Sequence, residues 1–423
     1  MNRRLWLKCS LLGAAGAFAA SASRAGHAGA RPRVLIVGGG FGGSACALHL
    51  RQLNPGIDLT LIDPFERYTT CPMSNEVIVG LRELSSLSVS RRGLRRAGIA
   101  VIAGRVARID SKRRRLQLAG GATLPYDRLV VAPGIRFLWD RIEGLSEAAA
   151  LRMPHAWMAG EQTALLAAQL RGMQDGGVVA ISVPAGFMRC PPGPYERASL
   201  IAHFLQRHKP RSKVLILDAN NSFPKQPQFT DGWQRLYPGL IEWLPVTQDG
   251  TVLRVDAGRL TLFTASAAHR VAVANVIPPQ APGELAPASG LASDHGWCPI
   301  DPQTFESTNI PGVHVIGDAC IADAMPKSAS AAVSQAQHCA AAIHAVLSGR
   351  SASESSFDSV CYGRLSPTLA LAFPGHFIAA DGRIVAPDPP TPALTSLDAA
   401  VAAQQSAAAE QWYAAIRRQA FAG

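Results

Sequence analysis

Three observations in the sequence predict an α/β protein with two Rossmann-type domains and a small C-terminal α+β domain. An apolar strand at residues 33–37 runs directly into a glycine-rich turn and an apolar helix. A second strand-turn-helix unit begins at residue 178, and after about residue 350 serine-rich and proline-rich stretches mark a separate C-terminal segment. With 48% hydrophobic and 17% charged residues among 423, the chain has the balance of a globular protein of two or three domains.

The first strand-turn-helix unit carries the pattern Gly38-x-Gly40-x-x-Gly43, and the next strand, at residues 58–62, ends in Asp63. Together these segments form a βαβ unit. Glycines at this spacing let the backbone approach a pyrophosphate at a helix N-terminus, and the acid accepts hydrogen bonds from ribose hydroxyls. The unit therefore predicts a dinucleotide site.

Two later segments favour FAD over NAD as that dinucleotide. Residues 126–134, which end in Gly134, resemble the strand-turn by which two-dinucleotide flavoproteins leave their first domain. Residues 313–318 resemble the later strand whose aspartate, here Asp318, holds the ribityl chain of FAD. The long separation from the glycine turn to Asp318 implies an inserted domain. We expect a glutathione-reductase-like flavoprotein with two dinucleotide-binding domains: an FAD-binding domain (residues 31–143 and 280–349), an inserted nucleotide-binding-like domain (144–279) and a C-terminal interface domain (350–423).

The turn of the inserted domain lacks the glycines that an NAD site needs. After the strand at residues 178–183 the chain reads Pro-Ala-Gly-Phe-Met-Arg-Cys190-Pro-Pro-Gly-Pro-Tyr-Glu196. Prolines fill the turn, so amide donors for a pyrophosphate are missing. Cys190 stands just before a helix, whose dipole is expected to favour the thiolate and lower the pKa of this cysteine. The segment therefore places a cysteine where a nucleotide site would need glycines.

The N-terminus predicts export. Residues 1–30 combine Arg3-Arg4, an apolar run at residues 11–22 and a small-residue cleavage site at residues 28–30. The run is shorter than the roughly 20 residues of a bilayer-spanning helix, so no stable membrane insertion is expected. The arginine pair favours a twin-arginine signal, which exports folded proteins with their cofactors, over a general secretory signal. We expect a periplasmic protein.

Removal of this signal would leave a basic chain with an odd number of cysteines. The net charge falls from +11 to +7 because four basic residues and no acids are lost, and seven of the eight cysteines remain. Basic runs such as residues 112–115 are short, so a nucleic-acid partner is not expected. The chain has no Cys-x-x-Cys-His haem motif and no cysteine pairs with zinc-site spacing, so neither its own haem nor a metal site is expected.

Four motifs resemble the flavoprotein subunit of flavocytochrome c sulfide dehydrogenase. They are residues 68–78 around Cys71, 190–196, 324–328 and 360–362 around Cys361, and the likeness extends from residue 33 to residue 423. It implies a thioether from Cys71 to the 8α-methyl of FAD and a redox disulfide between Cys190 and Cys361 beside the flavin. It also implies that Trp412 covers the flavin or lines a route out. The alternatives are a buried thiol at Cys71, a remote structural disulfide, and core packing of Trp412.

The same resemblance implies an enzyme that oxidises sulfide to zero-valent sulfur and passes electrons from FAD to haem on a separate c-type cytochrome subunit. Hydrosulfide would attack the disulfide, with Cys190 provisionally carrying the persulfide and Cys361 facing the flavin. Glu196, in the first turn of the helix, is the candidate proton acceptor, unless it only serves the helix dipole. Lys327 is a candidate for stabilising anionic reduced flavin, unless it is a surface lysine.

Three other functions remain as alternatives. A sulfide:quinone oxidoreductase shares the fold and the cysteine pair, but it needs an apolar membrane-docking tail, and residues 399–422 are rich in alanine. An NADH-dependent disulfide reductase is disfavoured because the second turn lacks its glycines. A non-catalytic flavoprotein accessory to a cytochrome or sulfur-oxidising system would need the glycine turn and Asp318, but neither Cys190 nor Cys361.

Overall fold

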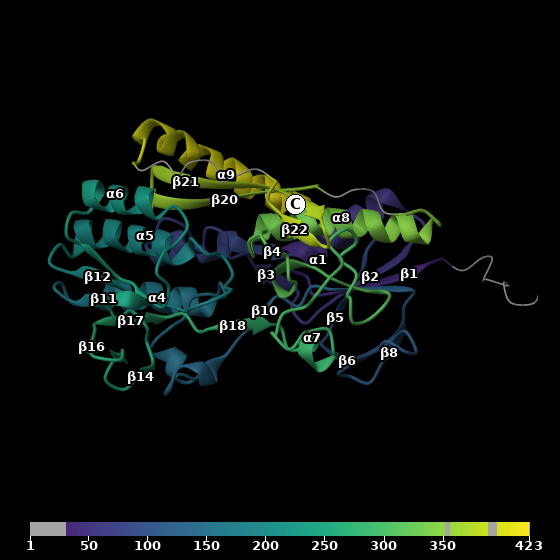
Figure 1. The fold of residues 1–423 in the computed structure, drawn as a ribbon, viewed down its shortest axis with the longest axis horizontal. Coiled ribbons are helices and arrows are strands. Elements are labelled where there is room, and N and C mark those ends of the chain that lie inside the picture. Colours follow the sequence, from purple (N-terminus) through teal and green to yellow (C-terminus); the bar gives the residue numbers. More distant parts are fainter. Residues whose placement is uncertain (1–30, 352–355, 388–395, 423) are drawn as a thin grey trace, which may run out of the picture.

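The computed structural model describes residues 31–351, 356–387 and 396–422 (Figure 1). Two lobes lie side by side, and the C-terminal segment runs across the top of both in this view. Each lobe contains a parallel sheet with helices packed on it, which confirms the predicted α/β class with two Rossmann-type domains. The export signal predicted at residues 1–30 lies outside the described residues.

A five-stranded parallel sheet forms the centre of the first lobe. Its strands are β1 (Arg33–Val37), β2 (Asp58–Asp63), β5 (Ala100–Ala103), β9 (Arg128–Val131) and β19 (Val313–Val315), in the order β19-β9-β1-β2-β5. The strands are apolar and mostly buried, as expected for a parallel sheet covered on its faces. β19 reaches this sheet only after the chain has formed the second lobe, so the sheet is completed by residues far apart in the sequence.

The other elements of this lobe cover the sheet and connect its strands. The long helices α1 (Phe41–Leu53) and α8 (Ala329–Leu347) pack against each other. The shorter elements are β3 (Arg67–Thr69), α2 (Ser74–Ile78), β4 (Ser88–Ser90), α3 (Arg92–Arg96), the antiparallel strands β6 (Val106–Asp110), β7 (Arg115–Leu118) and β8 (Thr123–Pro125), and α7 (Leu285–Ala288). Short 3-10 turns lie at Leu84–Leu87 and Gly317–Ala319 in this lobe, and at Trp139–Arg141, Ala149–Leu151 and Val246–Gln248 in the segment that forms the second lobe.

The second lobe repeats the same plan with fewer strands. Its parallel sheet has the order β13-β12-β11-β17, made by β11 (Val178–Val183), β12 (Lys213–Asp218), β13 (Ile241–Leu244) and β17 (Val273–Val276). Three helices pack on it, α4 (Glu161–Gly172), α5 (Gly193–His208) and α6 (Gln226–Leu236). A small antiparallel sheet adds β14 (Arg254–Asp256), β15 (Thr261–Phe263) and β16 (Ala268–Arg270). The chain enters and leaves this lobe through the antiparallel pair β10 (Ile135–Phe137) and β18 (Gln280–Pro282).

The C-terminal segment contains sheet and helix as predicted, but its described residues form no hydrophobic core of their own. It consists of β20 (Ser356–Ser366), β21 (Leu369–Ala380), β22 (Arg383–Val385) and the long helix α9 (Ala399–Phe421). Phe357 and Phe421 are buried in the core of the first lobe, whereas Leu365 and Leu397 are buried in the core of the second. The segment therefore holds the two lobes together.

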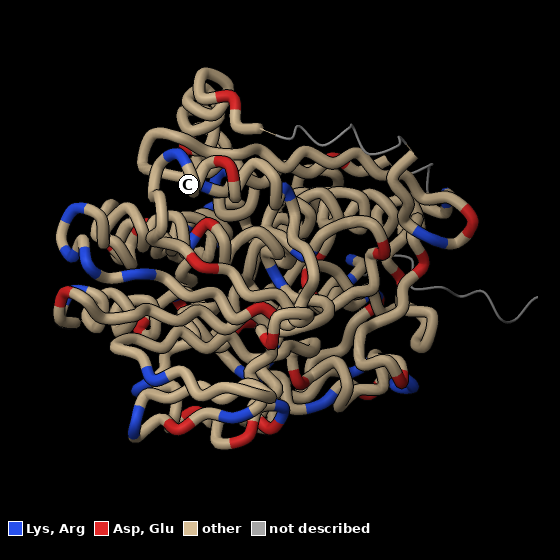
Figure 2. Tube along the Cα trace, turned by 60° about the vertical axis from the view of Figure 1, so that its left-hand side comes forward, with Lys and Arg blue, Asp and Glu red and all other residues tan. Residues whose placement is uncertain are grey.

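Charged residues are spread over the molecule. Figure 2 shows basic and acidic positions interspersed along the chain, without a long stretch of one sign in that view. The short basic run at residues 112–115 falls in the β6–β7 turn, where Arg113 pairs with Asp110 at 3.0 Å. The basic run therefore forms the turn of a hairpin.

Candidate active site

Two of the three motif glycines at the turn between β1 and α1 leave no room for a side chain. Gly38 has a φ of +99°, and a Cβ on it would lie 2.2 Å from the carbonyl oxygen of Ala132. A Cβ on Gly43 would lie 1.9 Å from the Gly38 oxygen. Gly40 is the residue that caps α1, and open space lies around it apart from Tyr68. The first amides of α1 therefore face a space that an anionic group can enter closely.

Asp63 ends β2 beside this turn, and a buried arginine holds it there. Its Oδ2 accepts a hydrogen bond of 2.6 Å from the Gly39 amide, and its Oδ1 lies 3.1 Å from Nη2 of Arg91. Arg91 is 1% exposed and also donates to the Gly39 carbonyl. Sequence reasoning missed Arg91 because it stands in a run of ordinary polar and basic residues far from the glycine motif.

One cavity of about 870 Å³ extends from the glycine turn to the predicted redox cysteines. Its volume lies within the range of roughly 300–1,000 Å³ seen for cofactor and ligand pockets. Gly43 and Lys327 are not among its lining residues. The predicted site residues that do line it are Gly38, Gly40, Asp63, Cys71, Gly134, Cys190, Glu196, Asp318, Cys361 and Trp412.

Three cysteines reach this cavity from three different segments. Cys71 precedes α2, Cys190 lies in the loop before α5, and Cys361 lies in the middle of β20. Cys190 has a left-handed backbone with φ of 55°, its amide donates to the Lys327 carbonyl at 2.8 Å, and its carbonyl accepts from Gly193. Because the loop is fixed at both ends of this residue, the Cys190 side chain is held toward the cavity.

Burial, rather than the helix dipole, governs the acidity of the two redox thiols. It raises the pKa of Cys190 far above its ordinary value, with a further increase from Cys361 and Glu196. Burial also raises the pKa of Cys361 to about 11, although a hydrogen bond with Ser328 lowers it. The expectation that the helix dipole lowers the pKa of Cys190 is therefore wrong, since desolvation of a thiolate outweighs the partial charge of a helix end.

Glu196 lies in the first turn of α5, and both of its carboxylate oxygens are engaged. Oε1 accepts from the backbone amide of Arg364 at 3.1 Å, and Oε2 accepts from the Asn75 side chain at 2.7 Å. Burial raises the pKa of this carboxyl above its ordinary value, and the two hydrogen bonds oppose the increase. A cavity-lining carboxyl with a raised pKa beside two thiols can exchange protons with them.

Asp318 lies in the turn after β19, and one of its charged neighbours, Arg189, comes from the Cys190 loop. Nη1 of Arg189 approaches it at 3.9 Å, while Nη2 of Arg189 donates to the Trp157 carbonyl. Burial raises the pKa of Asp318, and Arg189 and Lys327 lower it. Arg189 is a second arginine that sequence reasoning did not single out, although it directly precedes Cys190.

The structure places Lys327 beside the cavity wall rather than in it. Its Nζ donates to the carbonyls of Asp318 and Cys320, each at 2.8 Å, and lies 3.9 Å from the centre of the Trp297 ring. Lys327 is therefore half-buried and engaged with the backbone, not a free surface lysine. The adjacent Ser328, which caps α8 by accepting from the Ala331 amide, does line the cavity, so a helix N-terminus faces it.

Trp412 comes from α9 and lies at the cavity near Tyr362, with 5.5 Å between the ring centroids. Its indole Nε1 is buried and has no hydrogen-bond partner among the described residues. Gly134, with φ of +63° and open space around it, lines the cavity at the end of the first-lobe strand β9.

These features fit FAD. The glycine turn provides a cradle that side chains would fill, Asp63 and the α1 amides suit an adenosine diphosphate, and Asp318 suits a polyol chain. Trp412 and the three cysteines line the same cavity as the glycine turn, at the place where the ring of a bound flavin would lie. Among the described residues, His, Cys, Asp and Glu side chains form no group that could hold a metal ion.

Comparison with known proteins identifies the family. A family model described as the central part of the sulfide dehydrogenase [flavocytochrome c] flavoprotein chain matches residues 163–278, and the pyridine nucleotide-disulphide oxidoreductase model matches residues 32–157. The sulfide dehydrogenase [flavocytochrome c] flavoprotein chain of Chlorobaculum thiosulfatiphilum is 53% identical over 45 residues, which is 11% of this chain and 94% of that sequence. The chain belongs to this flavocytochrome c sulfide dehydrogenase flavoprotein family. The predicted resemblance is confirmed.

Relatives outside this family share the overall architecture. The mitochondrial sulfide:quinone oxidoreductase of Mus musculus is 23% identical over 72% of this chain and 68% of that protein. The solved sulfide:quinone oxidoreductase of Aquifex aeolicus superposes with a TM-score of 0.68 at 17% identity and covers 93% of both chains. At 17% identity this likeness shows that the chain has the same fold, and it does not show which molecule accepts the electrons. No helix in the described ranges is both long and apolar enough to cross a bilayer.

Proposed function

We propose that this chain is the flavoprotein subunit of a periplasmic sulfide dehydrogenase, which oxidises sulfide to zero-valent sulfur and passes the electrons to a c-type cytochrome subunit. One observation carries the proposal. Cys71, Cys190 and Cys361, from three separate segments, line a single cavity that begins at the dinucleotide turn. A structural disulfide or a core thiol has no need to face a cofactor-sized cavity, whereas a redox disulfide that works with a flavin does.

The reaction at the cysteine pair is thiol–disulfide exchange. Hydrosulfide attacks one sulfur of the Cys190–Cys361 disulfide, forms a persulfide on it and releases the other sulfur as a thiolate. When the persulfide loses its outer atom as zero-valent sulfur, both cysteines are reduced. Restoring the disulfide removes two electrons, so the balance is HS⁻ giving S⁰, one proton and two electrons. FAD, when bound, supplies a two-electron acceptor that can release electrons singly.

The remaining residues of the cavity would bind the cofactor and handle the proton. The glycine turn and Asp63 would hold the adenosine diphosphate, Asp318 the ribityl chain, and Cys71 would attach the flavin by a thioether. Glu196 is held by Asn75 and the Arg364 amide beside both thiols, so it is the group that accepts the proton. The positive end of α8 at Ser328, with Lys327 behind it, supports negative charge at the cavity.

A sulfide:quinone oxidoreductase is the second candidate, because the fold and the length match such enzymes over most of the chain. The two functions differ in the surface that meets the acceptor. Helix α9 buries Tyr413, Ile416 and Phe421, and alanines dominate the rest of it, which favours a protein partner over a membrane-docking helix. A non-catalytic flavoprotein accessory to a cytochrome or sulfur-oxidising system is the third candidate.

An anaerobic sulfide titration separates these functions. For sulfide dehydrogenase, sulfide bleaches the flavin absorbance near 450 nm (roughly where oxidised flavins absorb), and added oxidised cytochrome c restores it. Restoration by a short-chain quinone and not by cytochrome c would instead establish the quinone enzyme. An unchanged flavin spectrum would exclude both enzymes and leave the accessory role. Acid precipitation tests the Cys71 linkage, since a thioether keeps the yellow colour in the pellet.

A further inference from the structure

We propose that Arg364 is the positioning residue of the cysteine pair, and that a buried ion cluster around it sets how readily Cys190 and Cys361 form their disulfide. The Arg364 cluster consists of Arg364, Glu76, Glu410 and Arg82. The proposal rests on the proposed function only in taking Cys190 and Cys361 as the reacting pair, and its test needs no sulfide.

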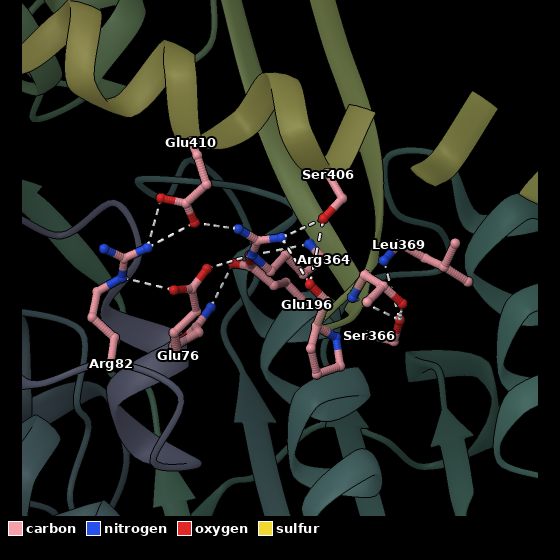
Figure 3. Close-up of polar contacts among 11 residues, drawn as sticks. Glu76, Arg82, Glu196, Arg364, Ser366, Leu369, Ser406 and Glu410 are labelled. Atoms are coloured by element: carbon pink, nitrogen blue, oxygen red, sulfur yellow. Dashed lines mark hydrogen bonds and ion pairs between the residues drawn. The ribbon is translucent and has the colours of Figure 1, made fainter. Parts of the chain in front are cut away.

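Arg364 makes contacts in three directions, as Figure 3 shows. Its Nε pairs with Glu76, its Nη2 lies 2.6 Å from Glu410, and its Nη1 donates to Ser406 at 2.7 Å. Arg82 pairs with the same two carboxylates from the outer side, at 2.7 Å each. The side chains of Arg364 and Glu76 are 6% exposed, whereas that of Glu410 is 48% exposed, so the cluster runs from the interior to the surface.

Three members of the cluster, Glu76, Arg364 and Glu410, lie within five residues of an active-site residue in the sequence. Glu76 is on α2, which follows Cys71, and Glu410 is on α9, two residues before Trp412. Arg364 is on β20, three residues after Cys361. The cluster therefore connects the segments that carry the predicted cofactor cysteine, one redox cysteine and the tryptophan.

The Cys190 segment is attached to the same cluster through hydrogen bonds. The Arg364 amide donates to Glu196 of α5, and Asn75, the neighbour of Glu76, donates to both Glu196 and the Gly193 carbonyl, the latter at 3.2 Å. The Gly193 amide in turn donates to the Cys190 carbonyl. The backbone of Arg364 thus joins β20 to α5, which follows the Cys190 loop, while its side chain anchors the same point of β20 to α2 and α9.

A positioning role for this cluster is favoured by the desolvation free energy of buried charges. Burying charges costs several kcal/mol of desolvation per ion, so well-packed apolar residues would give similar stability. A disulfide, in contrast, forms without strain only within a narrow range of Cα separations, about 4.4–6.8 Å. Directional contacts of one guanidinium to α2, α9 and the turn between β20 and β21 can hold that separation, which apolar packing specifies less sharply.

The test measures the disulfide equilibrium directly. Flavin-loaded protein is equilibrated anaerobically with mixtures of oxidised and reduced dithiothreitol, and free thiols are alkylated and located by peptide mass mapping. In the exchange, the thiols of Cys190 and Cys361 give two protons and two electrons to oxidised dithiothreitol and become a disulfide. We expect Arg364→Gln to shift this equilibrium toward the thiols by about tenfold or more, and Arg364→Lys to recover part of the loss.

Arg82→Gln is the matched control, because it removes a guanidinium from the same two carboxylates without touching β20. We expect it to keep the wild-type equilibrium within about twofold. Should Arg364→Gln fail to fold, Glu410→Gln loosens the cluster from its exposed end and should shift the equilibrium in the same direction, by less. Wild-type equilibria in Arg364→Lys and Glu410→Gln together, or equal shifts in Arg82→Gln and Arg364→Gln, would overturn the proposal.

The same assay separates this proposal from the proposed function. A wild-type protein that forms the Cys190–Cys361 disulfide but does not react with sulfide would end the sulfide dehydrogenase proposal and leave the role of Arg364 intact. Failure of the two cysteines to form a disulfide in the wild-type protein would overturn both.

Discussion

The two strand-to-helix turns of this chain have the same topology and opposite chemistry. Between β1 and α1 the chain uses only residues 38–40, all glycine, and the helix amides face the cavity directly. Between β11 and α5 it uses residues 184–192, with three prolines and a left-handed cysteine. The first turn suits a phosphate, and the second presents a sulfur. A Rossmann-type turn can therefore present a cysteine in place of a cradle of amides without changing the sheet that supports it.

Removing the sulfur from the second turn should have the largest effect. Cys190→Ser leaves no disulfide for hydrosulfide to attack, so sulfide-dependent bleaching of the flavin should fall by about a thousandfold or more. FAD content should stay at the wild-type level because the first turn is untouched. Stopped-flow absorbance near 450 nm (roughly the flavin maximum) measures the rate. Cys298→Ala, which changes a buried cysteine outside the cavity, is the control and should bleach normally.

Adding a methyl group to each turn should separate their roles. Gly38→Ala places a Cβ 2.2 Å from a backbone oxygen, so we expect a loss of about 4 kcal/mol in the free energy of unfolding and little bound FAD. Gly186→Ala, at φ of +82° with nothing within 4 Å of the new Cβ, should cost only about 1 kcal/mol, from its left-handed backbone. Flavin content and thermal melting measure both. Equal losses would show that backbone strain alone, not the close approach, governs the first turn.

Glu196, which lies in α5 directly after the second turn, should make the rate of flavin bleaching by sulfide depend on pH. Burial raises its pKa, so the carboxyl accepts a proton at higher pH than usual and loses its function as base when the pH falls through that raised pKa. The bleaching rate of the wild-type protein should fall over that range, and Glu196→Gln should be slower by about a hundredfold. Because ionisation of sulfide is common to both proteins, the ratio of their rates isolates Glu196. A ratio that does not change with pH would remove Glu196 as the proton acceptor.

The smallest expected effect concerns NADH, which should not reduce the flavin. The second turn has no amide cradle for a pyrophosphate, so NADH at concentrations that saturate related reductases should leave the flavin oxidised while sulfide reduces it. Anaerobic absorbance with each reductant makes the comparison. Rapid bleaching by NADH would show that residues 184–192 do not exclude a nucleotide and would favour a disulfide reductase.

The sequence predicted the parts of the molecule that depend on local patterns. The glycine spacing, Asp63 and the two-lobe architecture follow from short-range rules of strands, turns and helices, and the cysteine motifs identified the family. What it did not predict depends on contacts between distant segments. Arg91, Arg189 and Arg364 carry no local signal, since a buried arginine is recognised only by the carboxylates and carbonyls that fold around it.

Two physical expectations also needed the structure. A helix N-terminus was expected to acidify Cys190, but only the fold shows that the surrounding protein raises the pKa of this thiol instead. Lys327 was expected near the flavin, yet its ammonium turns to two carbonyls and the Trp297 ring. Burial and side-chain direction are properties of the packed molecule, so residue type and position along the chain do not determine them.

The C-terminal segment, which shares the cores of both lobes, has a consequence for how the protein is made. A ribosome completes Cys71 and Cys190 well before it reaches Cys361, and β20 can take its place only once both lobes exist to receive it. Cys71 and Cys190 are therefore present in a partly folded chain before β20, which carries Cys361, has packed against the lobes. The redox pair becomes possible as one of the last events of folding, so formation of the Cys190–Cys361 bond would report that the whole chain, and not one lobe, has reached its native state.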